Sequence, residues 1–533
     1  MKSIGFKNFR RFANLDPLQL GDITFFVGGN NAGKSTVVKA MMLVLDNIAT
    51  RNMTINSNKT FEAPTFRLDA NRIHEVHIGT FGRALHKPYP EQKEIVLEAD
   101  IDDYHFRYEL TGDTESKQAN SEIARLEIVN KQTNVSYLFD FHKNEAIVKY
   151  DTIVLKDFAS EYLLRSQRAQ AEERLNIMLQ RRAEIIAELK SVDGDAVQIA
   201  RLNSNLKMVD HSIKAIKQML DPFDGKLKNE AVEYKDSISL FEVGGYGSLL
   251  SALLQGLSRK FDKNVYFDAE GNELVAPEDE KESEQPLQEK AFARMLSEEA
   301  RRLFMLRSRN VIEYISAHAA TQKVLFSIED KNDYMASVIR EFKQCRITEG
   351  SKEDLFITRW MNELEIGIRY QIDPISGEAY TMEITNKQGN TMPLADMGMG
   401  SIQMMILLLK LATIINQKRG RDTIIIVEEP EQNIHPKLQS KLAELFAHVN
   451  REYGFRFVIE THSEYMIRKS QAMVANGDVA FEKNPFKVFF FPDEGEPYDM
   501  EYIETGTFAQ QFGKGFYDEA SSLSFQVLTA SNR

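Results

Sequence analysis

The chain has 533 residues, which is enough for three or four domains of ordinary size or for one large domain interrupted by insertions. Hydrophobic residues make up 43% of it and charged residues 27%, a globular balance that excludes wholesale disorder and fibrous repeats. The formal net charge of −13 excludes a protein whose whole surface coats DNA, so any contact with nucleic acid requires a local basic patch.

The cysteine and hydropathy patterns predict a soluble, cytoplasmic protein without membrane contact. Cys345 is the one cysteine, which excludes an intramolecular disulfide and cysteine-rich zinc sites and is typical of a reducing compartment. The N-terminal segment has no apolar core of signal-peptide length. The most apolar stretch, Met404–Ile415, is interrupted by Lys410 and is shorter than the ~20 residues that cross a bilayer.

Residues 1–157 mix strand and helix patterns. Ile4–Phe12 alternates enough to predict one strand, and Ile23–Val27 is an apolar run that ends in glycines, as a buried strand does when it enters a loop. Helical spacing of apolar residues follows over Ser35–Asn47. Further strands are expected at Glu94–Ile101, His105–Leu110 and Ala146–Leu155.

Residues 158–222 carry the pattern of an antiparallel helical hairpin. Apolar residues recur at heptad spacing beyond Leu164, with Arg182 as the one polar interruption, and a second series follows a turn at 191–195. The expected seam consists of Ala171, Leu175, Met178, Ile185 and Leu189 in the first helix and of Ile199, Leu202, Leu206, Val209, Ile213, Ile216 and Leu220 in the second.

Residues 223–350 predict a helical middle region. Its stretch at 268–289 is acidic and contains two prolines, which indicates a solvated or disordered insertion. Four arginines lie at the end of the helix expected over Lys290–Leu306 and just after it. They either contact nucleic-acid phosphates or, as we favour, form a solvated face paired with acidic neighbours. The group consists of Arg301, Arg302, Arg307 and Arg309, next to Glu298 and Glu299.

Residues 351–533 alternate strands with helices. Because residues 1–157 do the same, the two ends predict an α/β core that the helical insertion interrupts. The strands are expected at Tyr380–Thr385, Thr423–Val427, Phe455–Ile459 and Lys487–Phe491, and the helices at Ser401–Gln417 and Pro436–Tyr453.

A glycine-rich loop follows the buried strand at Ile23–Val27 and fits the pattern G-x-x-x-x-G-K-[ST]. Its glycines let backbone N–H groups turn inward around phosphate oxygens, and the helix that follows adds the partial positive charge of its N-terminus. Lys34 is expected to bridge the β- and γ-phosphates of a nucleotide, and Ser35 to ligate Mg²⁺. The nucleotide-binding residues predicted here are Gly28, Asn30, Asn31, Ala32, Gly33, Lys34, Ser35 and Thr36.

Two adjacent carboxylates end the apolar run Ile424–Val427, which is typical of a central parallel strand. Carboxylates at the carboxyl end of such a strand lie beside the phosphates of an α/β site. Successive side chains of a strand point to opposite faces, so we assign Glu428 to Mg²⁺, through water, and Glu429 as the general base for the attacking water.

Two further segments contribute candidates. His462 follows the strand expected at Phe455–Ile459, from where it can reach a γ-phosphate, and we assign it to catalysis. Gly398, Gly400 and Ser401 precede the long apolar helix. Ser401 is expected to be its N-cap, and the exposed N–H groups of this segment predict a second anion site.

In this order, the motifs resemble the ABC-type ATPase heads of the structural-maintenance, RecF and OLD groups. They resemble more closely the AAA-family ATPases of bacterial antiphage defence. Asn8-Phe9-Arg10, Ile434-His435-Pro436 and Gly515–Glu519 also fit that group, and His77–Phe81 resembles its segment near the Q-loop, without the glutamine. The resemblance covers roughly residues 1–110 and 355–520.

This resemblance implies a split head in which the N-lobe (1–157) and the C-lobe (351–533) form one ABC-type P-loop ATPase domain, with ATP and Mg²⁺ as cofactors. It implies a homodimer or higher homo-oligomer in which Gly398, Gly400 and Ser401 contact the γ-phosphate held by the partner's phosphate loop. His435 stands where these families usually have an aspartate that faces the dimer, so its role is open.

Among the defence ATPases the chain is most similar to the Septu or retron-associated subunit, which implies a nucleotide-gated sensor and scaffold for a separate nuclease, with the HNH type favoured. The sequence after His462 lacks the Toprim pattern of OLD nucleases, and Cys345 alone cannot form an HNH zinc site, so no intrinsic nuclease is expected. Direct binding of DNA or of a retron RNA–DNA element stays open.

Three alternatives remain: a PARIS-type defence ATPase with a different nuclease effector, a RecF- or SMC-like repair ATPase, and a scaffold with negligible turnover. The hairpin is the feature that discriminates the repair ATPase from the defence role. Between Ala159 and Lys217 it has ten Lys or Arg residues against eight Asp or Glu, a balance that favours contact with protein or an RNA–DNA element over free duplex.

Overall fold

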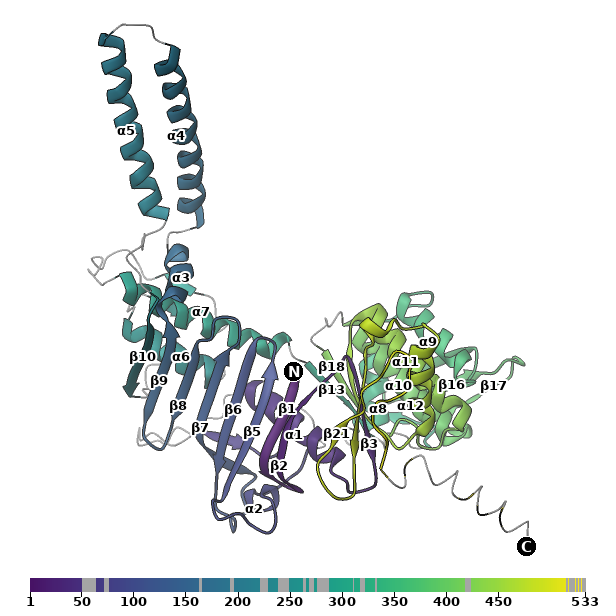
Figure 1. The fold of residues 1–533 in the computed structure, drawn as a ribbon. Helices are drawn as coiled ribbons and strands as arrows, with labels where there is room; N and C mark the ends of the chain where they lie inside the picture. The colour runs from purple at the N-terminus through teal and green to yellow at the C-terminus, as the bar shows by residue number, and fades with distance from the viewer. Residues whose placement is uncertain are drawn as a thin grey trace.

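The computed structural model describes residues 1–49, 64–70, 76–162, 165–191, 196–220, 229–237, 249–261, 265–267, 273–275, 287–309, 311–316, 322–330, 333–417, 423–513, 516, 523, 526 and 529. These residues form a head with two large sheets, from one end of which a pair of long helices projects (Figure 1). The expected α/β architecture is confirmed.

The central sheet joins the two ends of the chain. Within the described residues its strand order is β13 (Val311–Ile315), β18 (Thr423–Glu428), β19 (Arg456–Glu460), β3 (Ile23–Gly28), β20 (Phe486–Phe491) and β21 (Tyr498–Asp499). All neighbours are parallel except the last pair. Because β3 lies between β19 and β20, the N- and C-terminal segments complete one sheet, as the split head predicts.

Both faces of this sheet are covered, which explains why its strands are apolar throughout. Phe26, Val458 and Phe489 pack into a core shared with helix α1 (Lys34–Ala49). Alternate residues, such as Phe25 and Phe457, pack on the other face. There they meet helices α10 (Met399–Asn416), α11 (Pro436–Tyr453) and α12 (Glu464–Ala475).

The second large sheet belongs to the N-lobe and is antiparallel throughout its described pairs. Its order is β10 (Ala231–Ser237), β9 (Glu145–Asp151), β8 (Ser136–Asp140), β7 (Asn120–Asn130), β6 (Tyr104–Thr111), β5 (Glu94–Ile101), β1 (Ser3–Phe9) and β2 (Phe12–Gln19), with β4 (Thr65–Arg67) beside β7.

The single strand expected over Ile4–Phe12 is wrong. The chain turns at Arg10 and Arg11, so Phe9 pairs with Phe12 across a two-residue hairpin. Asn8 and Arg10 adopt positive φ angles of 55° and 52°, which a continuous strand does not allow. The turn brings both arginines to the side of the phosphate loop.

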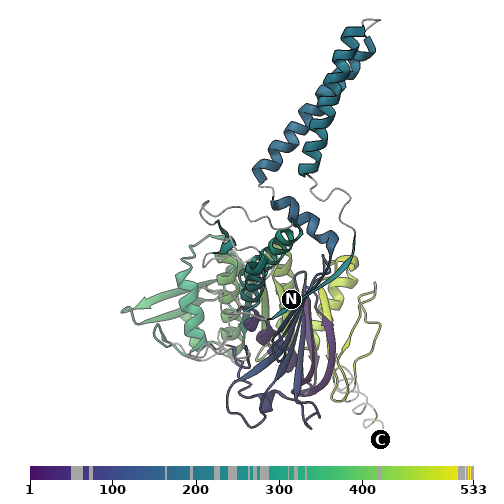
Figure 2. The same cartoon turned by 90° about the vertical axis from the view of Figure 1, so that its left-hand side faces the viewer.

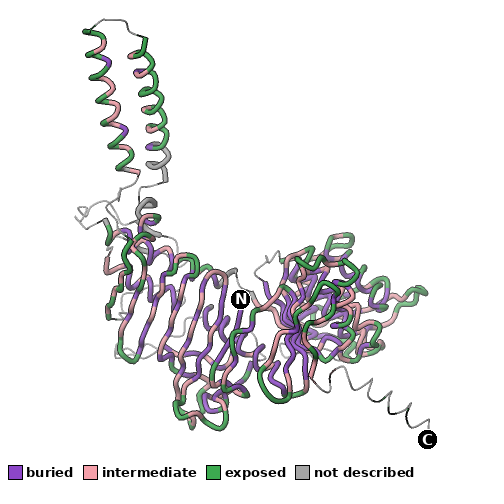
Figure 3. Tube along the Cα trace, in the orientation of Figure 1, coloured by how far each residue is buried: buried purple, intermediate pink, exposed green. Residues whose placement is uncertain are grey.

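The expected helical hairpin is present. It consists of α4 (Arg165–Ser191) and α5 (Ala196–Leu220), which rise away from the head after the short helix α3 (Leu155–Tyr162) (Figure 2). Every seam position with a described side chain is buried or half-buried, whereas most of the remaining surface is exposed (Figure 3). Arg182, the polar interruption, forms an ion pair with Asp210 across the two helices, with Nε 2.7 Å from Oδ1.

Replacing Ile213 by alanine is expected to destabilise the hairpin by about 2 kcal/mol, because this buried side chain fills the seam. Hydrogen exchange of amides in α4 and α5 measures the loss, and ATP hydrolysis by the head should not change. Val197→Ala is the matched control, since Val197 is 80% exposed. Loss of head stability together with the hairpin contradicts this prediction.

The sequence suggested a wholly helical middle region, and this expectation is wrong. Its helices α6 (Leu249–Phe261), α7 (Leu287–Arg309) and α8 (Tyr334–Gln344) are accompanied by strands that pair with both large sheets, because β10 extends the N-lobe sheet and β13 borders β18. The middle region also contains the strands β11 (Val265–Phe267), β12 (Glu273–Val275) and β14 (Phe326–Ser327). In the C-lobe, α9 (Lys352–Glu363) is followed by β15 (Arg369–Ile375), β16 (Ala379–Thr385) and β17 (Thr391–Pro393).

Two expectations for this region are only partly covered by the structure. Most of the acidic stretch 268–289 and the side chains of Arg307 and Arg309 lie outside the described residues. Arg301 and Arg302 both form ion pairs with Glu298, at 2.7 and 3.4 Å. This pairing supports the interpretation that the two arginines belong to a solvated helix face.

Helix α10 contains the most apolar stretch of the sequence. By length and composition it could cross a membrane, but 78% of it is buried inside the head. Lys410 is satisfied there by two carboxylates, with its Nζ 3.1 Å from Glu313 and 2.7 Å from Glu341. The helix therefore serves as the apolar centre of the C-lobe core.

Candidate functional site

The glycine-rich loop connects β3 to α1, as its pattern predicts. Gly28 and Gly33 have φ angles of +140° and +107°, a region that favours glycine. A Cβ atom would overlap the Phe491 carbonyl oxygen at Gly28 and the Phe12 ring at Gly33. The loop conformation thus requires glycine at these two positions.

Lys34 lies folded back over this loop. Its Nζ donates to the carbonyl oxygens of Gly28 and Gly29 at 3.1 and 2.8 Å, and lies 3.3 Å from Nε2 of His462. The side chain is only 3% exposed, and burial lowers the pKa of the ammonium despite the nearby carboxylates. A buried ammonium held by two carbonyl groups is positioned to exchange them for phosphate oxygens.

Ser35 contacts a residue that the sequence analysis did not assign. Its Oγ donates to Oε1 of Glu460 at 2.8 Å, across 425 positions of sequence. Glu460 is 6% exposed, and its Oε2 has no hydrogen-bond partner among the described residues. Burial raises the pKa of this carboxyl to about 7, against the lowering effect of the Ser35 hydrogen bond. Its place at the carboxyl end of β19 is the signal that could have identified it.

The two glutamates after β18 lie beside Glu460. Glu428 pairs with it in register on the neighbouring strand and contributes to raising its pKa. Glu429 turns out of the strand with a φ of +41°, and its N–H donates to the Glu460 carbonyl oxygen at 2.8 Å. Its Oε1 lies 3.8 Å from Nε2 of His462, and Gln432 donates to its Oε2.

His462 is therefore placed between Lys34 and Glu429. Burial and the neighbouring lysine lower the pKa of the imidazole, which favours its neutral form. Its backbone N–H donates to Oε1 of Glu431 at 2.6 Å. Glu431, a second residue without a predicted role, thus fixes the position of the histidine from the loop that carries Glu429.

The glycine–serine segment lies beside the loop that follows Glu429. Ser401 is not the N-cap of α10, because the helix starts earlier: Gly398 is the cap residue and no side chain caps it. A Cβ atom at Gly400 would overlap the Asn433 carbonyl oxygen, so the segment packs against the loop after Glu429. Gln403 also donates to the Glu429 carbonyl oxygen at 3.4 Å. None of Gly398, Gly400 and Ser401 lines the phosphate-loop pocket of its own chain.

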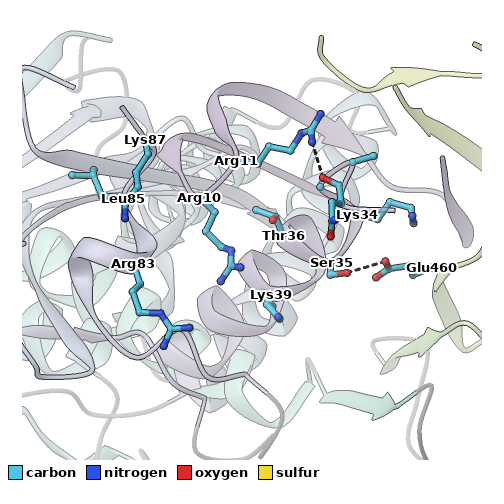
Figure 4. A pocket seen from close by; sticks show the side chains of 13 residues that line it. Arg10, Arg11, Lys34, Ser35, Thr36, Lys39, Arg83, Leu85, Lys87 and Glu460 are labelled. Atoms are coloured by element: carbon cyan, nitrogen blue, oxygen red, sulfur yellow. Dashed lines mark hydrogen bonds between the residues drawn. The ribbon is translucent and has the colours of Figure 1, made fainter. Parts of the chain in front are cut away.

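That pocket has a volume of about 600 Å³ and a strongly cationic wall (Figure 4). Asn31, Ala32, Gly33, Lys34, Ser35 and Thr36 line it, whereas Gly28 lines the hollow on the other side of the loop and Asn30 is exposed. The wall also includes residues that the sequence analysis did not assign to the site, namely Arg10, Arg11, Lys39, Arg83 and Lys87. Burial and the neighbouring Arg83 lower the pKa of Arg10.

The remaining predicted segments have local roles. His435 is the N-cap of α11, and its Nδ1 accepts a hydrogen bond from the Lys437 N–H at 3.2 Å. In the segment at 77–81, Gly79 donates to Asp69 at 3.1 Å and Thr80 caps the short helix α2 (Phe81–Ala84). Of Gly515–Glu519, only Phe516 is among the described residues.

A strand–loop–helix phosphate cradle, completed by acidic and histidine side chains from the neighbouring parallel strands, defines a P-loop ATPase. The family model described as "AAA ATPase domain" (AAA_15) matches residues 1–467, so the chain belongs to this ATPase family. Membership implies ATP binding and hydrolysis.

Solved structures to which the chain is similar include Smc head domains. One, with an extended coiled coil and bound to the C-terminal domain of ScpA, comes from Pyrococcus furiosus; it is 10% identical, with coverage of 100% of this chain and 99% of that chain and a TM-score of 0.31. Another, from Thermotoga maritima, is 8% identical, with coverage of 94% and 98% and a TM-score of 0.33. No curated protein matches the sequence.

Proposed function

We propose that the chain hydrolyses ATP at the phosphate loop, between the cationic pocket and the hollow lined by His462, with Glu429 as the general base and His462 at the γ-phosphate. The observation that supports it most is the convergence of Lys34, His462 and Glu429, in which Nε2 of the histidine lies 3.3 Å from the lysine Nζ and 3.8 Å from a Glu429 carboxylate oxygen. Lys34 and the loop N–H groups hold the phosphates. Glu429 accepts the proton of the attacking water, and His462 orients that water against the phosphate.

The residues around Ser35 fit a magnesium ion. Ser35 Oγ, Glu428 and Glu460 offer the oxygen ligands that Mg²⁺ prefers, and Glu460 Oε2 is a buried acceptor without a partner among the described residues. We propose that Ser35 contacts the ion directly and that the two carboxylates hold its water ligands. When bound, the ion neutralises charge on the phosphate oxygens.

Replacing Glu460 by glutamine is expected to raise the Mg²⁺ concentration that gives half-maximal ATP hydrolysis by about tenfold, because removing an outer carboxylate weakens metal affinity 10- to 100-fold. The amide can still accept the Ser35 hydrogen bond, so the loop should keep its shape. Phosphate release is measured over a Mg²⁺ titration, with Glu482→Gln as the exposed control. An unchanged Mg²⁺ requirement excludes Glu460 from the metal site.

We further propose that two copies enclose the nucleotide, with Gly398, Gly400 and Ser401 of each facing the other's phosphate loop. The support is that this segment presents a helix N-terminus and packs against the loop after Glu429. Gel filtration of a Glu429→Gln variant with and without ATP tests it. We expect a larger species with ATP, and a size that ATP does not change argues against the dimer.

For the biological role, we propose the ATPase subunit of a cytoplasmic antiphage defence complex that controls a separate nuclease of HNH type. The order of motifs supports it, and ATP-dependent closure of two heads provides a switch for a bound effector. The test is co-purification with the product of the neighbouring gene, followed by plasmid cleavage with and without ATP. Cleavage by this chain alone overturns the proposal, and a co-purified effector of another kind favours the PARIS-type alternative.

The repair ATPase is the second candidate; it accounts for the projecting hairpin, although the balance of ten basic to eight acidic residues in that hairpin disfavours free duplex DNA. Its helices have 27 and 25 residues, about 40 Å of helix. Binding of duplex DNA that depends on the hairpin and falls steeply with salt favours this alternative.

A further inference from the structure

A second hollow lies on the C-lobe and shares no lining residue with the phosphate-loop pocket. It has a volume of about 390 Å³ and is bounded by helices α9, α11 and α12. Helix α11 contributes Glu444, His448 and Arg451, which are spaced by four and three positions and so share one helix face. A hollow of this size accommodates a small molecule.

The floor of the hollow is aromatic and carries unused hydrogen-bonding atoms. Trp360 is 3% exposed, and its indole Nε1 has no partner among the described residues; the same holds for Nδ1 of His448. The two rings lie 5.6 Å apart, and His448 also stacks on Phe356. Buried indole N–H groups usually have a partner, and each unsatisfied polar group costs about 1–3 kcal/mol. Both of these nitrogen atoms are buried, so the floor offers a ligand aromatic carbon surface.

The rim of the hollow is basic. The Arg359 guanidinium lies 5.7 Å from the centre of the Trp360 ring, and exposed Arg451, whose Nε pairs with Glu452 at 3.2 Å, lines the same hollow. Of the two acids in the lining, Glu444 is already paired with Lys469 at 2.7 Å, which leaves Asp478 against the two arginines. Guanidinium groups bind carboxylates and phosphates through two hydrogen bonds and stack on rings.

We propose that this hollow binds a small aromatic anion. Its ring lies against Trp360 and His448, and its carboxylate or phosphate group meets Arg359 and Arg451. Helices α11 and α12 both start at the catalytic segments, with His435 and Ser463 as their N-caps, and Ser463 donates to Gln439 at 2.6 Å. The ligand therefore contacts α11, a helix whose other end borders the nucleotide site.

Trp360 is the only tryptophan in the sequence, so its fluorescence reports on this hollow directly. The full chain is titrated, without ATP, with benzoate and with phenyl phosphate, which carry the same ring and different acidic groups. We expect a saturable change in Trp360 emission with at least one of them. The anion that binds more tightly identifies the acidic group that the hollow prefers. Benzyl alcohol and inorganic phosphate, which supply the ring and the charge separately, should give no saturation over the same range.

Variants test the assignment of the residues. Arg451→Ala is expected to weaken binding at least about tenfold, because a charge-assisted hydrogen bond is lost. The matched control is Arg468→Ala, an exposed arginine of α12 outside the lining. Lys34→Ala should bind the anion as the unaltered chain does, which separates this site from the nucleotide site. The proposal is overturned when neither anion saturates, when phosphate or benzyl alcohol alone saturates, or when Arg451→Ala binds with unchanged affinity.

Discussion

Replacing Glu429 by glutamine is expected to lower the rate of phosphate release about 1,000-fold, since general-base catalysis contributes roughly 100- to 10,000-fold. The amide has the shape of the carboxylate but cannot accept the proton of the attacking water. ATP affinity should stay within about threefold, because a group that acts only in the transition state contributes little to ground-state binding. Phosphate release at saturating ATP and nucleotide binding at equilibrium measure the two quantities separately.

Glu504→Gln is the control for this prediction, as Glu504 is exposed. A loss of rate below tenfold with intact binding places the base elsewhere. Negligible turnover by the unaltered chain itself, with ATP bound, favours a nucleotide-gated scaffold.

Replacing Lys34 by alanine is expected to weaken ATP binding about 100-fold. Hydrogen bonds to charged groups contribute about 1.5–3 kcal/mol, and about 1.4 kcal/mol corresponds to tenfold in affinity. The ammonium is 3% exposed and held against the loop, so its charge acts on bound phosphates with little screening by solvent. Isothermal titration with ATP, in the presence of Mg²⁺, measures the change.

Lys39→Ala is the matched control, because Lys39 lines the same pocket from the same helix. Lys39 is half-buried and lies one turn further along α1, so its replacement should weaken ATP binding by less than about tenfold. Equal effects of the two substitutions would mean that the pocket attracts the nucleotide by its total charge, without a specific role for Lys34.

Local sequence patterns were sufficient to predict the helices and strands that carry the site. Expected and observed bounds coincide for the helix Pro436–Tyr453 and the strand Glu94–Ile101. The heptad pattern located the seam of the hairpin, because helical packing is encoded by spacing within one segment. The glycine-rich loop was recognisable for the same reason, since its conformation depends on residues within eight positions.

Contacts between distant segments could not be predicted from local sequence patterns. The Ser35–Glu460 hydrogen bond and the basic wall with Arg83 and Lys87 depend on which strands lie side by side, and no periodicity carries that information. The strands of the middle region were missed because β10 and β13 gain their stability from pairing with sheets formed elsewhere in the chain.

By itself the sequence determined that a phosphate-binding loop exists, that two carboxylates and a histidine end buried strands, and that a helical pair interrupts the chain. Only the tertiary structure decided that these segments meet. Insertion of β3 between β19 and β20 brings Lys34, Glu429 and His462 together, because parallel strands that share a sheet present their carboxyl ends at one edge. The same arrangement made Glu460 the neighbour of Ser35, which residues 425 positions apart could not reveal through local spacing.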